Sequence, residues 1–142
     1  MRYDKIIRSG RAGVYAAPRI IGPLRAAAKR ASVAWLDFDL AGVADCDAFF
    51  RRCAEVFALP GYFGRNWDAL HECMLDYAGS GTPGVVVHWR RGTELARRAP
   101  EVVTTALEIL EDAATYWRSS GRIFLVAVER DSARGVALRP LR

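Results

Sequence analysis

The sequence has little cysteine and histidine, and it has no long apolar segment. Its three cysteines, Cys46, Cys53 and Cys73, are odd in number and lack metal-ligand spacing, so we expect reduced structural thiols and no metal site. There is no run of roughly 18 or more apolar residues, and scattered arginines stand near the start of the chain in place of a signal-peptide pattern. We therefore expect a soluble, cytoplasmic protein that makes no contact with a membrane.

Sequence motifs of the common enzyme classes are also missing. The chain has no phosphate-binding loop, no metal-ligand cluster and no Gly-x-Ser-x-Gly motif. His71 and Glu72 resemble an acid–base pair, but neighbouring residues of a helix point about 100° apart. His88 lies in an apolar run between Val87 and Trp89, which is typical of a packed residue. We therefore expect that the chain is not an enzyme and that it needs no cofactor.

The net charge of +5 is divided unevenly along the chain. Residues 1–32 carry a net charge of +7 and residues 130–142 carry +3, whereas residues 33–129 hold nine basic and fourteen acidic residues, a net charge of −5. A basic protein often binds nucleic acid, but the acidic central region argues against direct nucleic-acid binding. The alternative is an RNA-binding or assembly module that uses the basic ends. That alternative predicts a steep salt dependence of RNA binding, lost on removal of residues 1–32.

The 142 residues, 51% of them hydrophobic and 11% aromatic, can form one modest core but not two domains. Apolar periodicity predicts a strand, two helices, a strand, a helix and a strand. Their approximate ranges are 33–39, 45–58, a helix beginning at 67, 85–89, 100–119 and 123–128, with a further helix at 20–30. Strands joined through helices run parallel, so we expect an α/β fold with a small parallel sheet.

Three carboxylates lie four residues apart in the helix that begins at Trp67. Asp68, Glu72 and Asp76 share one face of this helix, and Leu70 and Met74 share the other. Like charges at this spacing repel each other by about 0.2–0.5 kcal/mol per pair. The row therefore indicates a binding surface for a positively charged partner, although an amphipathic helix with a solvated acidic face gives the same pattern.

The residues before this helix define how the chain enters it. Asn66 stands where an N-cap belongs, and Gly64 permits a sharp turn. Tyr62 and Phe63 then lie beside the acidic row, where an aromatic ring can stack on a cationic or planar group.

The stretch 59–73 reads Leu-Pro-x-Tyr-Phe-Gly-x-Asn-x-Asp-Ala-Leu-x-x-Cys, where x is any residue. This run resembles the signature of the barstar family, the intracellular protein inhibitors of the ribonuclease barnase. The flanking segments follow the order of the family, and the resemblance covers residues 33–129. It implies a barstar-like three-stranded parallel sheet packed with helices. A basic N-terminal extension, residues 1–32, precedes this domain, and a basic tail, residues 130–142, follows it.

The resemblance also implies a function: a bacterial immunity protein that inhibits a barnase-like extracellular ribonuclease or another cationic nuclease toxin. Its carboxylates would imitate the phosphates of RNA and accept charge-assisted hydrogen bonds in the active site. The family's two helix carboxylates correspond to Asp68 and Glu72, and we expect Glu72 to enter deepest. The remaining candidate partner-binding residues are Tyr62, Phe63, Gly64, Arg65, Asn66, His71 and Asp76.

The chain departs from the family pattern at four places. Glu72 is one methylene longer than the family's usual aspartate, and His71 stands where a tryptophan is found in the family. Tyr116 and Ser120 are uncharged where the family offers further acidic contacts. Arg65 is basic within an acidic surface, and we expect it to pair with Asp68 or to reach an acidic residue of the target.

Overall fold

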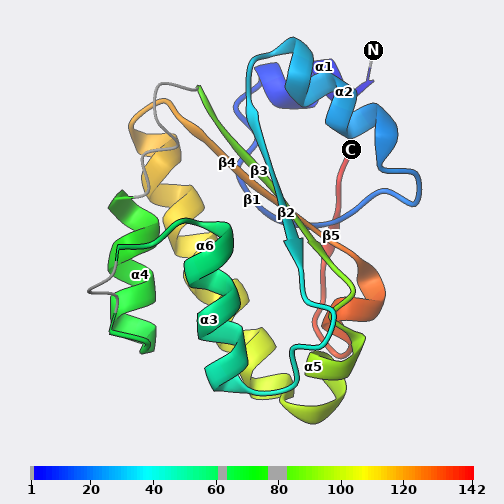
Figure 1. Ribbon diagram of the computed structural model, residues 1–142. Coiled ribbons are helices and arrows are strands. Elements are labelled where there is room, and N and C mark those ends of the chain that lie inside the picture. The colour runs from blue at the N-terminus through cyan, green and yellow to red at the C-terminus, as the bar shows by residue number, and fades with distance from the viewer. Residues whose placement is uncertain (1, 61–63, 77–82) are drawn as a thin grey trace.

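The computed structural model describes residues 2–60, 64–76 and 83–142, which form an α/β architecture (Figure 1). The elements, in chain order, are α1 (Arg2–Arg8), β1 (Gly13–Ala16), α2 (Gly22–Arg30), β2 (Ala34–Asp39), α3 (Cys46–Val56), α4 (Trp67–Asp76), β3 (Gly84–Arg90), α5 (Thr93–Arg98), α6 (Pro100–Ser119), β4 (Ile123–Val128), the 3-10 helix η1 (Arg130–Ala133) and β5 (Arg139–Pro140). The predicted parallel α/β class is therefore confirmed.

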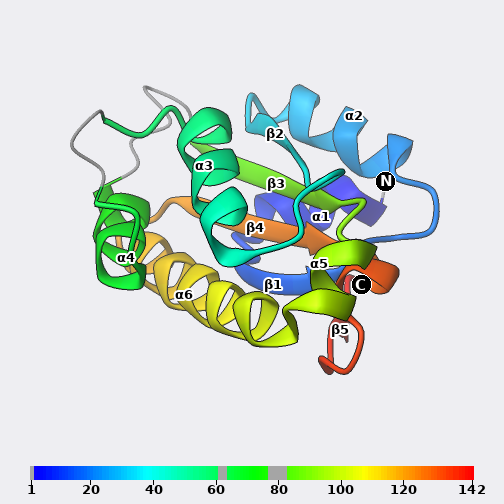
Figure 2. The same cartoon turned by 60° about the horizontal axis from the view of Figure 1, so that its bottom comes forward.

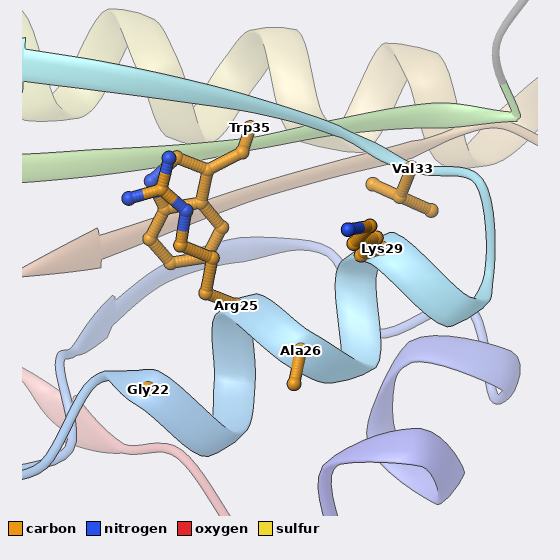
Figure 3. Close-up of a pocket in the computed structure, with 6 residues that line it drawn as sticks. All are labelled: Gly22, Arg25, Ala26, Lys29, Val33 and Trp35. Atoms are coloured by element: carbon orange, nitrogen blue, oxygen red, sulfur yellow. The ribbon is translucent and has the colours of Figure 1, made fainter.

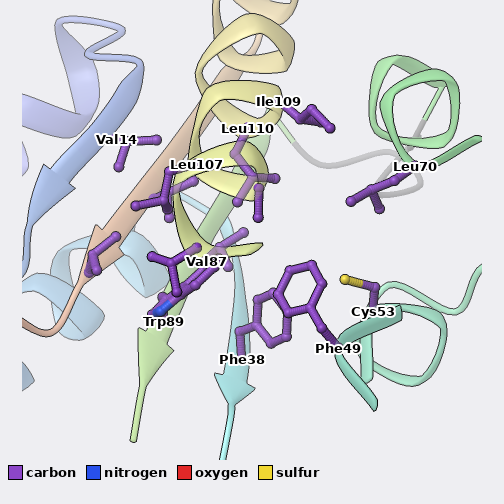
Figure 4. Close-up of a cluster of buried hydrophobic side chains, with 14 of the residues drawn as sticks. Val14, Phe38, Phe49, Cys53, Leu70, Val87, Trp89, Leu107, Ile109 and Leu110 are labelled. Carbon is purple, nitrogen blue, oxygen red and sulfur yellow. The ribbon is translucent and has the colours of Figure 1, made fainter. Parts of the chain in front are cut away.

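The five strands form one parallel sheet in the order β2-β3-β4-β1-β5. Helices α3, α4 and α6 cover one face, and α1 and α2 cover the other (Figures 1 and 2). Each face has its own cluster of buried apolar side chains. The larger cluster lies beneath α3, α4 and α6, and Phe38, Phe49, Trp89 and Leu110 are among its members (Figure 4).

The prediction of a three-stranded sheet was wrong. Strands β2, β3 and β4 are the three expected ones, but the sheet continues through β1 and β5, which come from the two terminal segments. These two strands have four and two residues, too short for a recognisable alternation of apolar and polar side chains. Pairing across the sheet stabilises them, since Gly13 aligns with Leu125 and Tyr15 with Arg139.

Polar contacts join β1 and β5 to α6. The Glu111 carboxylate of α6 accepts a hydrogen bond of 2.6 Å from the backbone N–H of Val14, and it forms an ion pair of 2.8 Å with Arg139. Gly13 has φ +118°, and a Cβ atom there would lie 2.7 Å from the Arg139 guanidinium. L side chains rarely adopt this φ, so glycine is favoured at the point where β1 passes this ion pair.

The N-terminal segment completes the second face of the sheet. Ile6, Ile7 and Leu24 of α1 and α2 are buried against Val86 and Leu125 of β3 and β4. Burial of each such side chain stabilises the fold by about 1.5–3 kcal/mol. Removal of residues 1–32 would uncover this cluster, so that truncation cannot separate RNA binding from loss of the fold.

Candidate functional site

The entry to α4 has the N-cap predicted from the sequence. Asn66 Oδ1 accepts a hydrogen bond of 2.8 Å from the backbone N–H of Ala69, and Asn66 Nδ2 donates to the carbonyl of Gly64 at 3.3 Å. Arg65 just before the cap has φ +51°, so the chain turns sharply there. The cap and the turn together fix the direction in which α4 leaves the loop.

Apolar contacts hold α4 against the rest of the larger layer. Leu70 and Met74 are 1% and 0% exposed. Figure 4 shows Leu70 pointing from α4 into the space that it shares with Ile109 of α6. At the start of α4, the Trp67 ring packs against Phe50 of α3, with ring centres 4.8 Å apart.

The last turn of α4 is held by a hydrogen bond from α6. Trp117 Nε1 donates to the carbonyl of Met74 at 3.0 Å, and this contact is buried. Met74 is among the last four residues of α4, whose carbonyls have no partner within the helix. α4 is thus anchored at both ends, and its outer face is presented on a rigid support.

The outer face of α4 carries the acidic row. Asp68, Glu72 and Asp76 are all exposed, and His71 is half-buried on its flank. Within the part of the chain that the structure describes, no basic side chain pairs with these three carboxylates. Arg65 is exposed and forms no ion pair with Asp68 there, contrary to one of the two roles predicted for it.

The carboxylates of the sheet differ from those of α4 because arginines neutralise them. Arg90 binds Asp37 through two hydrogen bonds of 2.6 and 2.7 Å, and Arg91 binds Asp39. The hydrogen bond from Arg91 lowers the pKa of Asp39 to about 2. The bond from Arg90 lowers the pKa of Asp37. These ion pairs stabilise the carboxyl ends of β2 and β3, whereas no described basic side chain pairs with the carboxylates of α4.

The structure brings most of the predicted binding residues together on α4 and its entry. Gly64, Arg65 and Asn66 are exposed at the start of the helix, next to the acidic row. Tyr62 and Phe63, the two predicted aromatic contacts, lie outside the described residues.

Tyr116 of α6 is a further candidate whose exposure the sequence did not reveal. Its side chain is 55% exposed, although it is large and apolar. It follows Ile109 by seven residues, so both lie on the side of α6 that faces α4. Exposed tyrosines are frequent anchors of protein–protein interfaces. The sequence alone does not show this exposure, because it depends on where the adjoining helix lies.

Among the described residues, His88 and the three cysteines are the other side chains with reactive groups. Desolvation lowers the pKa of His88, whose ring contacts Trp35 with ring centres 5.6 Å apart on the α2 side of the sheet. The three cysteines are free thiols, and burial raises the pKa of Cys53, which keeps it protonated and unreactive. In residues 2–60, 64–76 and 83–142, no group of three or more His, Cys, Asp or Glu side chains is arranged to hold a metal ion.

A family model matches the larger part of the chain. The family model described as Barstar (barnase inhibitor) matches residues 33–129, about two-thirds of the chain. No curated protein matches the chain significantly. Among the helices of the described residues, none has the length and apolar character needed to span a membrane.

Proposed function

The chain belongs to the barstar family, and from this premise we propose that it inhibits a ribonuclease of the barnase type by placing the outer face of α4 in the enzyme's active site. The observation that carries this proposal is the row of exposed carboxylates on α4, which no described basic side chain neutralises. A ribonuclease binds RNA phosphates through cationic side chains. The same side chains can donate charge-assisted hydrogen bonds to Asp68 and Glu72.

The rigidity of α4 supports this function. A binding helix that is already ordered loses little conformational freedom when the complex forms. The N-cap at Asn66 and the Trp117–Met74 hydrogen bond provide this order at the two ends of the helix. The unneutralised carboxylates also attract a cationic enzyme over a distance and thereby raise the association rate.

We assign separate roles to the residues of α4, of the loop before it and of α6. Glu72, at the centre of the row, enters the active site deepest, and Asp68 is a second anchor beside the start of the helix. Asp76 extends the row, with His71 on its flank. Gly64, Arg65 and Asn66 present the loop backbone, and Tyr62 and Phe63 supply the aromatic contacts. Tyr116 packs at the edge of the interface.

The length of the Glu72 side chain sets a requirement for the enzyme. Its carboxylate reaches one methylene further than an aspartate would, so the cationic pocket of the cognate ribonuclease must lie correspondingly deeper. The partner is therefore a barnase-like ribonuclease or a related cationic nuclease toxin that differs from barnase in this pocket. The inhibitor would act in the cytoplasm, where it protects the cell that makes the enzyme or a cell attacked by it.

The test is inhibition of a barnase-type ribonuclease by the wild type and by the Asp68→Ala/Glu72→Ala variant. The wild type should inhibit at about one molecule per enzyme, and the variant should lose this inhibition. Glu101→Ala/Glu108→Ala is the matched control, because it removes two exposed carboxylates from α6 and should inhibit like the wild type.

The role of Glu72 is tested separately. Glu72→Ala should weaken binding by at least tenfold, about 1.4 kcal/mol. A smaller loss would refute the assignment of Glu72 as the deepest contact. A folded wild type that inhibits no barnase-type ribonuclease would refute the proposed function.

A further inference from the structure

A pocket lies between α2 and β2, on the face of the sheet opposite α4 (Figures 1 and 3). Its volume is about 520 Å³, which is within the range of small-ligand sites. The lining residues are Gly22, Arg25, Ala26, Lys29, Val33 and Trp35.

The pocket exists because β2 is the edge strand of the sheet. Leu24, Ala27 and Ala28 of α2 are buried in the smaller apolar cluster, the second core, on the face of the sheet that α1 and α2 cover. The adjoining side of α2 extends beyond the edge strand β2. Gly22 and Ala26 on that side have little or no side chain, so a hollow remains between the helix and Trp35. Figure 3 shows the Arg25 guanidinium lying across the indole, with its central carbon 5.5 Å from the ring centre.

Every polar side-chain group that lines the pocket is a hydrogen-bond donor. These groups are the Arg25 guanidinium, the Lys29 ammonium and the Trp35 indole N–H. Neither Arg25 nor Lys29 pairs with a carboxylate among the described residues, whereas Arg30 of the same helix is bound to Asp4 by two bonds of 2.8 and 2.9 Å. The sequence between Asp4 and Asp37 contains no acidic residue at all. The pocket is therefore suited to binding an anion.

The aromatic wall narrows the class of anion. Trp35 is half-buried, and its ring contacts the guanidinium of Arg25 and the ring of His88 in β3. An indole with one cation at its ring and a second cation one turn further along α2 suits a ligand that joins a planar ring to a phosphate. A base can stack at the indole while the phosphate accepts bonds from the cations. A simple carboxylate would use the cations but not the ring.

We propose that this pocket binds a nucleotide, either free or within a single-stranded RNA, with its phosphate at Arg25 and Lys29 and its base against Trp35. This site goes beyond the proposed inhibition of a ribonuclease, and it lies on the other side of the sheet, so both surfaces can be occupied together. It also revises our expectation that the chain does not bind nucleic acid, which rested on the summed charge of each segment. The structure places Arg25 and Lys29, two cations of the N-terminal segment, in one pocket with Trp35.

The test follows the indole N–H signal of Trp35 by NMR during titration with adenosine monophosphate, a short oligoadenylate and inorganic phosphate. The signal is assigned by its loss in Trp35→Phe. Adenosine monophosphate should shift this signal at concentrations up to about 1 mM. Arg25→Ala/Lys29→Ala should weaken binding by at least tenfold. Trp35→Ala lacks this signal, so its binding is followed by the backbone amide signal of Ala26, which also lines the pocket. Its affinity should fall by about 5- to 150-fold, the range for loss of one base–aromatic stack.

Arg97→Ala/Arg118→Ala is the matched control, because it removes two exposed arginines from α5 and α6, outside the pocket. It should leave the affinity for adenosine monophosphate unchanged. Tenfold tighter binding of the oligoadenylate than of the mononucleotide would assign the site to RNA, and equal affinities would assign it to the free nucleotide.

Three results would overturn the proposal. The first is that no nucleotide shifts the Trp35 signal at about 1 mM, which would leave Arg25 and Trp35 as a surface packing pair. The second is that inorganic phosphate binds as tightly as the nucleotide, which would show that the ring is not used. The third is equal weakening by the control variant, which would indicate attraction to the overall charge. Because none of these variants alters α4, ribonuclease inhibition by the same proteins reports on the proposed function independently.

Discussion

Two buried tryptophans allow the anchor of α4 to be measured. Trp117 and Trp89 are 1% and 0% exposed, and both belong to the larger core. Trp117 Nε1 donates to the carbonyl of Met74, whereas Trp89 Nε1 is buried without a hydrogen-bond partner among the described residues. The substitutions Trp117→Phe and Trp89→Phe remove a similar volume of ring, and they differ in what happens to the N–H group.

The expected difference follows from this contrast. Trp117→Phe leaves a buried carbonyl unsatisfied, which costs about 1–3 kcal/mol. Trp89→Phe removes a buried donor that has no partner, which offsets part of the cavity cost by about 1–3 kcal/mol. Trp117→Phe should therefore reduce the free energy of unfolding by at least about 2 kcal/mol more than Trp89→Phe.

Urea unfolding followed by far-ultraviolet circular dichroism measures both variants without relying on tryptophan fluorescence. Hydrogen exchange adds a local measurement. The amides in the last turn of α4 should exchange faster in Trp117→Phe than in the wild type, and at the wild-type rate in Trp89→Phe. Equal destabilisation by the two substitutions, or a greater effect of Trp89→Phe, would refute the reasoning that the Trp117 hydrogen bond anchors α4.

Three further predictions concern the cap, an ion pair and the second core. Asn66→Ala removes the acceptor for the Ala69 N–H and should reduce the free energy of unfolding by about 1 kcal/mol, whereas Asn66→Asp should preserve it; urea unfolding distinguishes the two. The pKa of Asp39 is lowered to about 2, so its bond to Arg91 stabilises the fold above about pH 4 and is lost as the pH falls through about 2. The urea midpoint of Asp39→Asn should therefore fall less than that of the wild type over this range, and identical acid profiles would contradict this. Leu24→Ala, at a site that is 0% exposed, should cost about 2–5 kcal/mol in the same assay, and a cost below about 1 kcal/mol would show that α2 is not packed on the sheet as described.

The features that the sequence predicted correctly depend on neighbouring residues. The N-cap at Asn66 and the buried face of α4 could be recognised because their signals lie within about one or two helical turns. Strands β2, β3 and β4 could be recognised because each is a run of six or seven mostly apolar residues.

The features that the sequence could not predict depend on distant residues. β1 is a strand only because Val14 and Tyr15 pair with β4, more than a hundred residues later. The pocket joins cations of α2 to Trp35 of β2, and the anchor of α4 joins Trp117 to Met74. No local pattern connects such pairs, because the sheet order and the helix packing bring them together.

The interior position of β1, between β4 and β5, has a consequence for how the chain folds. β1 precedes both of its neighbours in the sheet, β4 and β5, by more than a hundred residues. At a synthesis rate of about 5–20 residues per second, β1 waits roughly 5–20 s for its first partner. Until then β1 lacks both of its neighbouring strands, and the loop that must close spans more than a hundred residues. The pairing of β1 with β4 and β5 is therefore a late step of folding, so substitutions in β1 and in β5 should slow the same step.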